Sequence, residues 1–87
     1  MFFVALLKLR GKVTQAVIDA MQNSCQNPPP GIKYQSVFFT LGQYDLVIIF
    51  EAPDEKEAMK LAVLSAEFCQ NQTMTAVPYK EALELLK

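Results

Sequence analysis

The stretch that decides the fold is residues 41–54, LGQYDLVIIFEAPD. Its Gly-Gln pair predicts a tight connection, because the glycine at position 42 can take a positive φ. The β-branched and aromatic run that follows predicts a strand over Tyr44–Glu51 that is covered on both faces. An Ala-Pro pair then ends the strand, and Asp54 is the expected N-cap of a helix, with a glutamate three residues on as its capping-box partner.

Three more strands are predicted around this stretch. Residues Phe2–Leu9 are apolar at both parities, which indicates a second central strand covered on both sides. Residues Ile32–Leu41 alternate more between apolar and polar side chains, so this strand is expected to be less buried. Residues Gln72–Val77 are polar enough for an edge strand, and Pro78 after them removes a backbone donor, which only an edge or a strand end tolerates.

Three helices are expected between and after these strands. Residues Val13–Cys25 carry an apolar stripe at a spacing of four, made of Val13, Val17, Met21 and Cys25. The helix capped by Asp54 is expected to run to about Gln70, with mostly small residues facing the sheet: Ala58, Leu61, Ala62, Ser65, Ala66 and Cys69. Residues Tyr79–Lys87 form a short amphipathic helix, which must dock on something because it is too short to be stable alone.

The element order is therefore β-α-β-β-α-β with a helical tail, which is the α+β plan of a ferredoxin-like domain. The 87 residues fit one such domain over 1–87, with a four-stranded antiparallel sheet and two helices on one face. This plan places the first and third strands in the middle of the sheet. Those are the two strands that apolarity alone marks as central, so two independent signals agree.

The apolar content predicts an assembly. Hydrophobic residues make up 52% of the chain, which is more than a domain of this size can bury alone. Two helices cover one face of the sheet, yet the middle strands are apolar on the other face too. We expect a second copy to cover that face, giving a homodimer or higher homo-oligomer of the dimeric α/β barrel type. The alternative is a monomer with an apolar face.

Composition also excludes several classes of function. Eight Lys+Arg against nine Asp+Glu give a net charge of -1 with no basic run, so no nucleic-acid partner is expected. There is no histidine and no Gly-rich phosphate loop, and we expect no catalytic residue, no cofactor and no metal. No membrane segment or signal peptide is expected. Cys25 and Cys69 fit no metal spacing and lie at opposite ends of the helix layer, so reduced thiols and the cytoplasm are expected.

One polar cluster is a candidate site. Asp45 brings a charge to the start of a central strand, and such a charge needs a partner. It is expected to pair with Lys8 or Arg10 at the end of the neighbouring strand, or to cap backbone N–H groups of the turn. The alternative is that Tyr44, Asp45, Lys8 and Thr40 rim a pocket and orient a small polar ligand.

The Gly-x-Tyr-Asp turn over residues 42–45, leading into a buried strand and the Glu-Ala-Pro-Asp of residues 51–54, resembles the GYD domain family. Residues 37–42, VFFTLG, also resemble that family's approach to the motif. The resemblance implies a small α+β protein of the dimeric barrel type and no established reaction. A similar turn occurs in the effector-binding domains of leucine-responsive and asparagine-type regulators, which bind small molecules such as amino acids at subunit interfaces. The DNA-binding helix-turn-helix of those regulators has no counterpart in these residues.

The expected function is a dimeric module that binds a small polar metabolite near the turn over residues 42–45. One alternative is a cofactor-independent enzyme of the dimeric barrel type, such as a monooxygenase or isomerase, which would rely on a shaped apolar cavity with a few polar groups. Another is a purely structural or partner-binding subunit. A large closed cavity lined by Tyr44 and Asp45 favours a binding module or an enzyme, and a solidly packed sheet interface favours the structural subunit.

Overall fold

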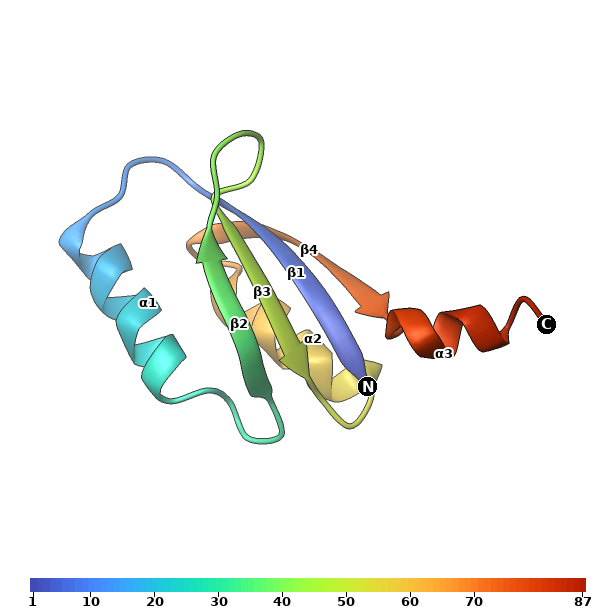
Figure 1. Cartoon of the computed structure of the whole chain (residues 1–87). Coiled ribbons are helices and arrows are strands. Elements are labelled where there is room, and N and C mark those ends of the chain that lie inside the picture. Colours follow the sequence, from blue (N-terminus) through green and yellow to red (C-terminus); the bar gives the residue numbers. More distant parts are fainter.

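The computed structural model describes all 87 residues and shows one four-stranded antiparallel sheet with three helices (Figure 1). The elements in chain order are β1 (Phe2–Leu9), α1 (Gln15–Gln26), β2 (Lys33–Phe39), β3 (Leu46–Glu51), α2 (Glu55–Ser65), β4 (Cys69–Ala76) and α3 (Tyr79–Glu84). The strand order is β2-β3-β1-β4. This confirms the ferredoxin-like α+β plan, with β1 and β3 in the middle and β2 and β4 at the edges.

One face of the sheet carries the core. Alternate residues of β1 and β3 are buried on this side, called here the helix face because α2 covers it. The rings of Phe3 and Phe50, both fully buried, stack on neighbouring strands with their centroids 5.4 Å apart. The buried core cluster consists of Phe3, Ala5, Leu7, Ile32, Leu46, Ile48, Phe50, Ala52, Ala58, Leu61 and Cys69.

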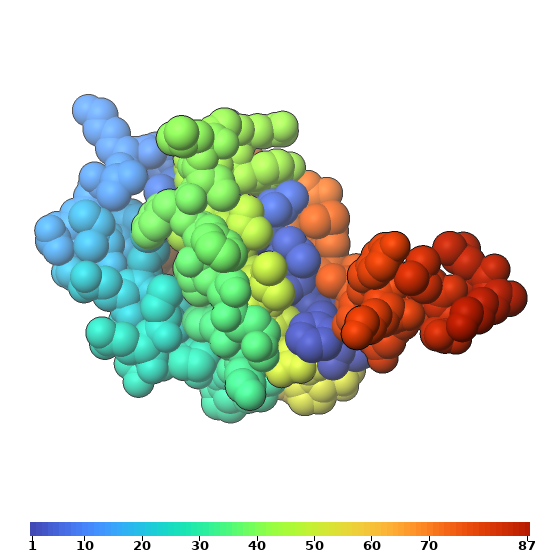
Figure 2. All heavy atoms as spheres, in the orientation of Figure 1, coloured from blue at the N-terminus to red at the C-terminus, as the bar shows by residue number.

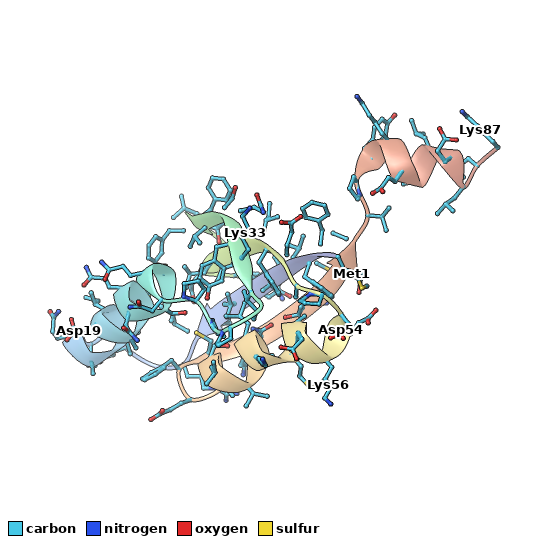
Figure 3. All side chains as sticks on the ribbon, turned by 90° about the horizontal axis from the view of Figure 1, so that it is seen from below. Met1, Asp19, Lys33, Asp54, Lys56 and Lys87 are labelled. Carbon is cyan, nitrogen blue, oxygen red and sulfur yellow. The ribbon has the colours of Figure 1, made fainter.

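The other side of the sheet has no cover (Figure 2). The side chains on this open face come from all four strands: Phe2, Val4, Leu6, Phe38, Val47, Ile49, Met74 and Ala76. Phe38 remains 54% exposed and Met74 41% exposed, whereas the members from β1 and β3 are half-buried by one another. Figure 3 shows side chains, aromatic rings among them, standing on the sheet opposite α2. Within the single chain, the central strands are thus covered on one side only.

The second helix ends earlier than the sequence predicts. α2 stops at Ser65, and β4 begins at Cys69 in place of Gln72. The reason is that β4 pairs with the whole of β1, from Phe2 opposite Ala76 to Leu9 opposite Cys69, which satisfies backbone groups that a longer helix would leave unpaired. Cys69 is buried as predicted, but from a strand.

The first helix packs less closely than its sequence predicts. The side chain of Thr14 caps α1 by accepting from the Val17 N–H at 3.3 Å, so Val13 lies outside the helix and is 57% exposed. Val17 is the one buried residue of α1, and Cys25 is exposed. The helix stands beside the edge strand β2 in Figure 1. The predicted stripe of four apolar residues therefore does not all reach the core.

The third helix leaves the body of the molecule. α3 follows directly after β4 and Pro78, and it points away from the sheet (Figures 1 and 2). None of its residues is buried, and Leu85 and Leu86 just after it are 80% and 82% exposed. The helix is shorter than predicted, and nothing in the single chain docks it.

Candidate functional site

The turn over residues 40–45 is held to the end of β1 by backbone and side-chain hydrogen bonds. Asp45 Oδ2 accepts from the Leu9 N–H at 2.7 Å, and the Asp45 N–H donates to the Leu7 carbonyl at 2.8 Å. Gly42 lies within this connection at φ +113°, a conformation that favours glycine. β2 thus ends at Phe39 and β3 begins at Leu46, because the residues between them serve this connection.

Asp45 acts here as a backbone cap. Neither of the two ion pairs of the structure, Lys60–Glu57 and Lys87–Glu84, involves Asp45. Of the two structural roles expected for this carboxylate, pairing with a neighbouring cation is absent, and capping is present. The capped group belongs to β1 and not to the turn itself.

The polar atoms of Thr40 and Tyr44 also have partners within the chain. The Thr40 hydroxyl donates to the Tyr44 carbonyl at 2.6 Å, and the Tyr44 hydroxyl donates to Gln72 Oε1 at 2.8 Å. Gln72 lies opposite Leu6 on the open face, so Tyr44 links the turn to the edge strand β4 across that side. Lys8 is exposed on the same side. The structure brings these residues to one end of the sheet and gives Thr40, Tyr44 and Asp45 structural contacts.

A separate cavity of about 900 Å³ lies between α1, the helix face of the sheet and α2. Sixteen of its 24 lining residues are hydrophobic, and none is Asp, Glu, Lys or Arg. Its apolar lining residues include Leu9, Ile18, Met21, Phe39, Leu64 and Phe68. None of the four predicted site residues at the turn lines this cavity. Its volume is in the range of small-molecule sites, about 300–1,000 Å³.

The cavity holds one pair of hydroxyl groups. Tyr34 Oη and Ser24 Oγ lie 2.9 Å apart, one on β2 and the other near the end of α1. Burial raises the pKa of Tyr34, the hydrogen bond between Tyr34 and Ser24 acts in the opposite direction, and nearby Cys25 raises it further. The phenol therefore remains neutral at neutral pH.

Two free thiols line the same cavity. Cys25 lies on α1, and Cys69 begins β4. Burial raises the pKa of the Cys69 thiol, the Asp45 carboxylate adds to this, and Arg10 opposes it. A raised pKa keeps this thiol protonated, which is the unreactive form.

The cavity is not predicted from the sequence, because the apolar stripe of α1 predicts a helix that packs closely along its length. The available signal was the second half of the helix, residues 22–26, where QNSCQ offers one apolar side chain to fill the space. A helix whose inner face becomes polar halfway along cannot complete a core there.

The structure contains no group of three or more His, Cys, Asp or Glu residues that could hold a metal ion. No buried side-chain nitrogen or oxygen lacks a hydrogen-bond partner. No helix has both the length and the apolarity needed to cross a membrane.

Strand order, helix placement and the Gly-x-Tyr-Asp turn define a ferredoxin-like α+β domain with an added C-terminal helix. The family model of the GYD domain matches residues 4–86, which is nearly the whole chain. The chain therefore belongs to the GYD domain family. No curated protein matches it.

Proposed function

We propose that this GYD domain is a homodimeric binding module, in which two copies pack their open faces together and the pair binds a small molecule. The open face carries the proposal. It presents apolar side chains from all four strands, and α2 and α1 leave it uncovered. A contiguous apolar surface of this kind on a small domain marks an interaction site.

The pattern of the open face suits a second copy of the chain. Its centre is formed by β1 and β3, where Val4, Leu6, Val47 and Ile49 carry no charge. Charged and amide side chains lie around this centre on the same side, namely Lys8, Lys33, Glu51, Gln70 and Gln72. Two such faces can meet about a twofold axis with their apolar centres in contact and like charges kept at the edges.

The arm formed by α3 supports the same assembly. Tyr79 and the leucines at its end are exposed, and the arm leaves the molecule at the end of β4, an edge of the open face. A helix of six residues is not stable alone in water. In the proposed dimer, the arm lies on the partner copy, which covers these side chains.

The turn over residues 40–45 lies beside the proposed interface. Lys8 and the Tyr44–Gln72 hydrogen bond face the open side of the sheet, so a ligand held by Tyr44, Asp45, Lys8 and Thr40 would contact both copies.

The two free cysteines are in keeping with a reducing compartment such as the cytoplasm.

The oligomeric state of a Val47→Lys variant tests the dimer. Val47 lies at the centre of the open face, opposite Leu6 and Phe38. A lysine there remains solvated in the monomer but is buried in the dimer, so we expect the dissociation constant to rise about 100-fold or more. Sedimentation velocity over a dilution series measures this.

Val63→Lys is the matched control, because Val63 is exposed on α2 away from the open face. It should leave the dimer intact. A wild-type chain that sediments as a monomer at all concentrations, or a Val47→Lys chain that dimerises like the wild type, contradicts the proposal.

A further inference from the structure

We propose that the cavity between α1, the helix face and α2 is a second small-molecule site, and that it takes an uncharged, mainly apolar molecule with one hydrogen-bonding group. This inference goes beyond the proposed function, which places a ligand at the turn over residues 40–45. The site differs from the polar cluster at the turn over residues 40–45 and lies on the opposite side of the sheet from the open face.

The size and lining of the cavity point to an organic ligand. It measures about 900 Å³, and its apolar wall is assembled from α1, β2, β3, β1 and α2 together. Ile48 and Leu61 in this wall are buried, while Ile18 and Leu64 are exposed to solvent. An apolar space of this size leaves its wall without packing contacts that a bound apolar molecule would restore.

The charge of the lining selects against ionic ligands. None of the 24 lining residues carries a formal charge, so a carboxylate or ammonium entering the cavity would lose its hydration without a charged partner. Amino acids and phosphorylated metabolites are thereby disfavoured. A neutral molecule loses little on entry and gains the contact with the apolar wall.

The hydroxyl pair provides the polar end. Tyr34 Oη and Ser24 Oγ share one hydrogen bond at 2.9 Å, which leaves one O–H free to donate and lone pairs free to accept. Burial raises the pKa of Tyr34, so the phenol keeps its proton and remains a donor. A carbonyl, a hydroxyl or an uncharged aromatic amine on the ligand can therefore bind at this end of the cavity.

Two fluorescent probes with the same ring skeleton test this inference on the full chain. N-phenyl-1-naphthylamine is neutral, and 8-anilino-1-naphthalenesulfonate is the same molecule with an added sulfonate. We expect saturable binding of the neutral probe, with one site per chain. The sulfonate is expected to weaken binding about tenfold or more, because its charge finds no partner.

Ile18→Glu places a charge in the cavity wall and should weaken binding of the neutral probe about tenfold. Ala16→Glu is the matched control, because Ala16 is an exposed residue of the same helix outside the cavity lining, and it should bind like the wild type. Tyr34→Phe keeps the ring and removes the hydroxyl, so we expect a loss of about two- to tenfold. Circular dichroism confirms that each variant folds.

Val47→Lys separates this inference from the dimer. If it yields monomers that bind the neutral probe like the wild type, the cavity is the site and the open face is not. Equal binding of both probes, no saturable binding to the folded wild type, or undiminished binding to Ile18→Glu overturns the inference. The absence of saturable binding is the result expected if α1 closes onto the sheet and leaves no space. A Tyr34→Phe variant with unchanged affinity refutes the assigned polar end.

Discussion

The two faces of the sheet are built from the same strands, yet they differ in what covers them. On β3, Leu46, Ile48 and Phe50 are buried on the helix face, while Val47 and Ile49 between them are only half-buried on the open face. The side chains are equally apolar on both sides. Apolarity in a strand thus shows that a face needs cover, but not whether the cover comes from the same chain or from another molecule.

The largest expected difference between the faces is in stability. Phe50→Ala removes a fully buried ring stacked on Phe3, and should lower the free energy of unfolding by about 3–5 kcal/mol. Ile49→Ala, one residue away on the open face, should cost markedly less in a monomer. Urea unfolding of both variants in the Val47→Lys background removes any contribution from dimerisation. Equal losses would show that the open face is already covered within one chain.

The next largest effect concerns the turn over residues 40–45, where Asp45 holds the end of β1. Asp45→Asn weakens a 2.7 Å charge-assisted bond to the Leu9 N–H and should lower the free energy of unfolding by about 1–3 kcal/mol. Urea unfolding measures the loss, and ligand-induced NMR shifts are compared between variant and wild type. Loss of stability without any ligand supports the capping role. A variant of unchanged stability that no longer responds to a polar metabolite supports the pocket predicted from Tyr44, Asp45, Lys8 and Thr40.

Removal of the arm formed by α3 tests whether the arm contributes to the dimer interface. A chain ending at Val77 lacks α3 and the two leucines after it, and should dimerise about tenfold more weakly because less apolar surface is buried. Sedimentation of both chains gives the two dissociation constants. An unchanged constant would show that the arm does not lie on the partner copy.

The smallest expected effect is a dependence on alkaline pH that comes from the helix face. The pKa of Tyr34 and that of Cys69 are both raised from ordinary values of 10.0 and 9.0 by burial. The folded chain therefore holds the protons of these two groups more tightly than the unfolded chain. The stability that the protonated groups contribute is complete below pH 9, and it is lost as the pH rises through the raised pKa values of the folded state. Tyr34→Phe combined with Cys69→Ala should flatten the fall of unfolding free energy above pH 9, which urea titrations at several pH values measure.

The sequence predicts the sheet well because its central strands differ so clearly from its edges. Both parities of Phe2–Leu9 and of the run after Asp45 are apolar, and the structure places these two strands in the middle. The boundaries of α2 and β4 were wrong, because residues 66–71 have no strong periodicity and their state is decided by pairing with β1.

The site was less predictable. Asp45 is charged and lies at the start of a strand that pairs antiparallel with β1. A structural partner for its carboxylate near the end of β1 could therefore be expected from the sequence. The cavity could not be located in this way. Its existence depends on how far α1 stands from the sheet, and the buried Val17 and exposed Val13 differ in their placement and not in their residue type.

β3 separates the cavity on the helix face from the open face by a single layer of backbone. Ile48 points into the cavity, and its neighbours Val47 and Ile49 point to the opposite side. In a pair of copies joined through their open faces, both cavities would face outward. Each cavity could then bind or release its ligand while the dimer stays together. The two ligands would be separated by the thickness of two sheets.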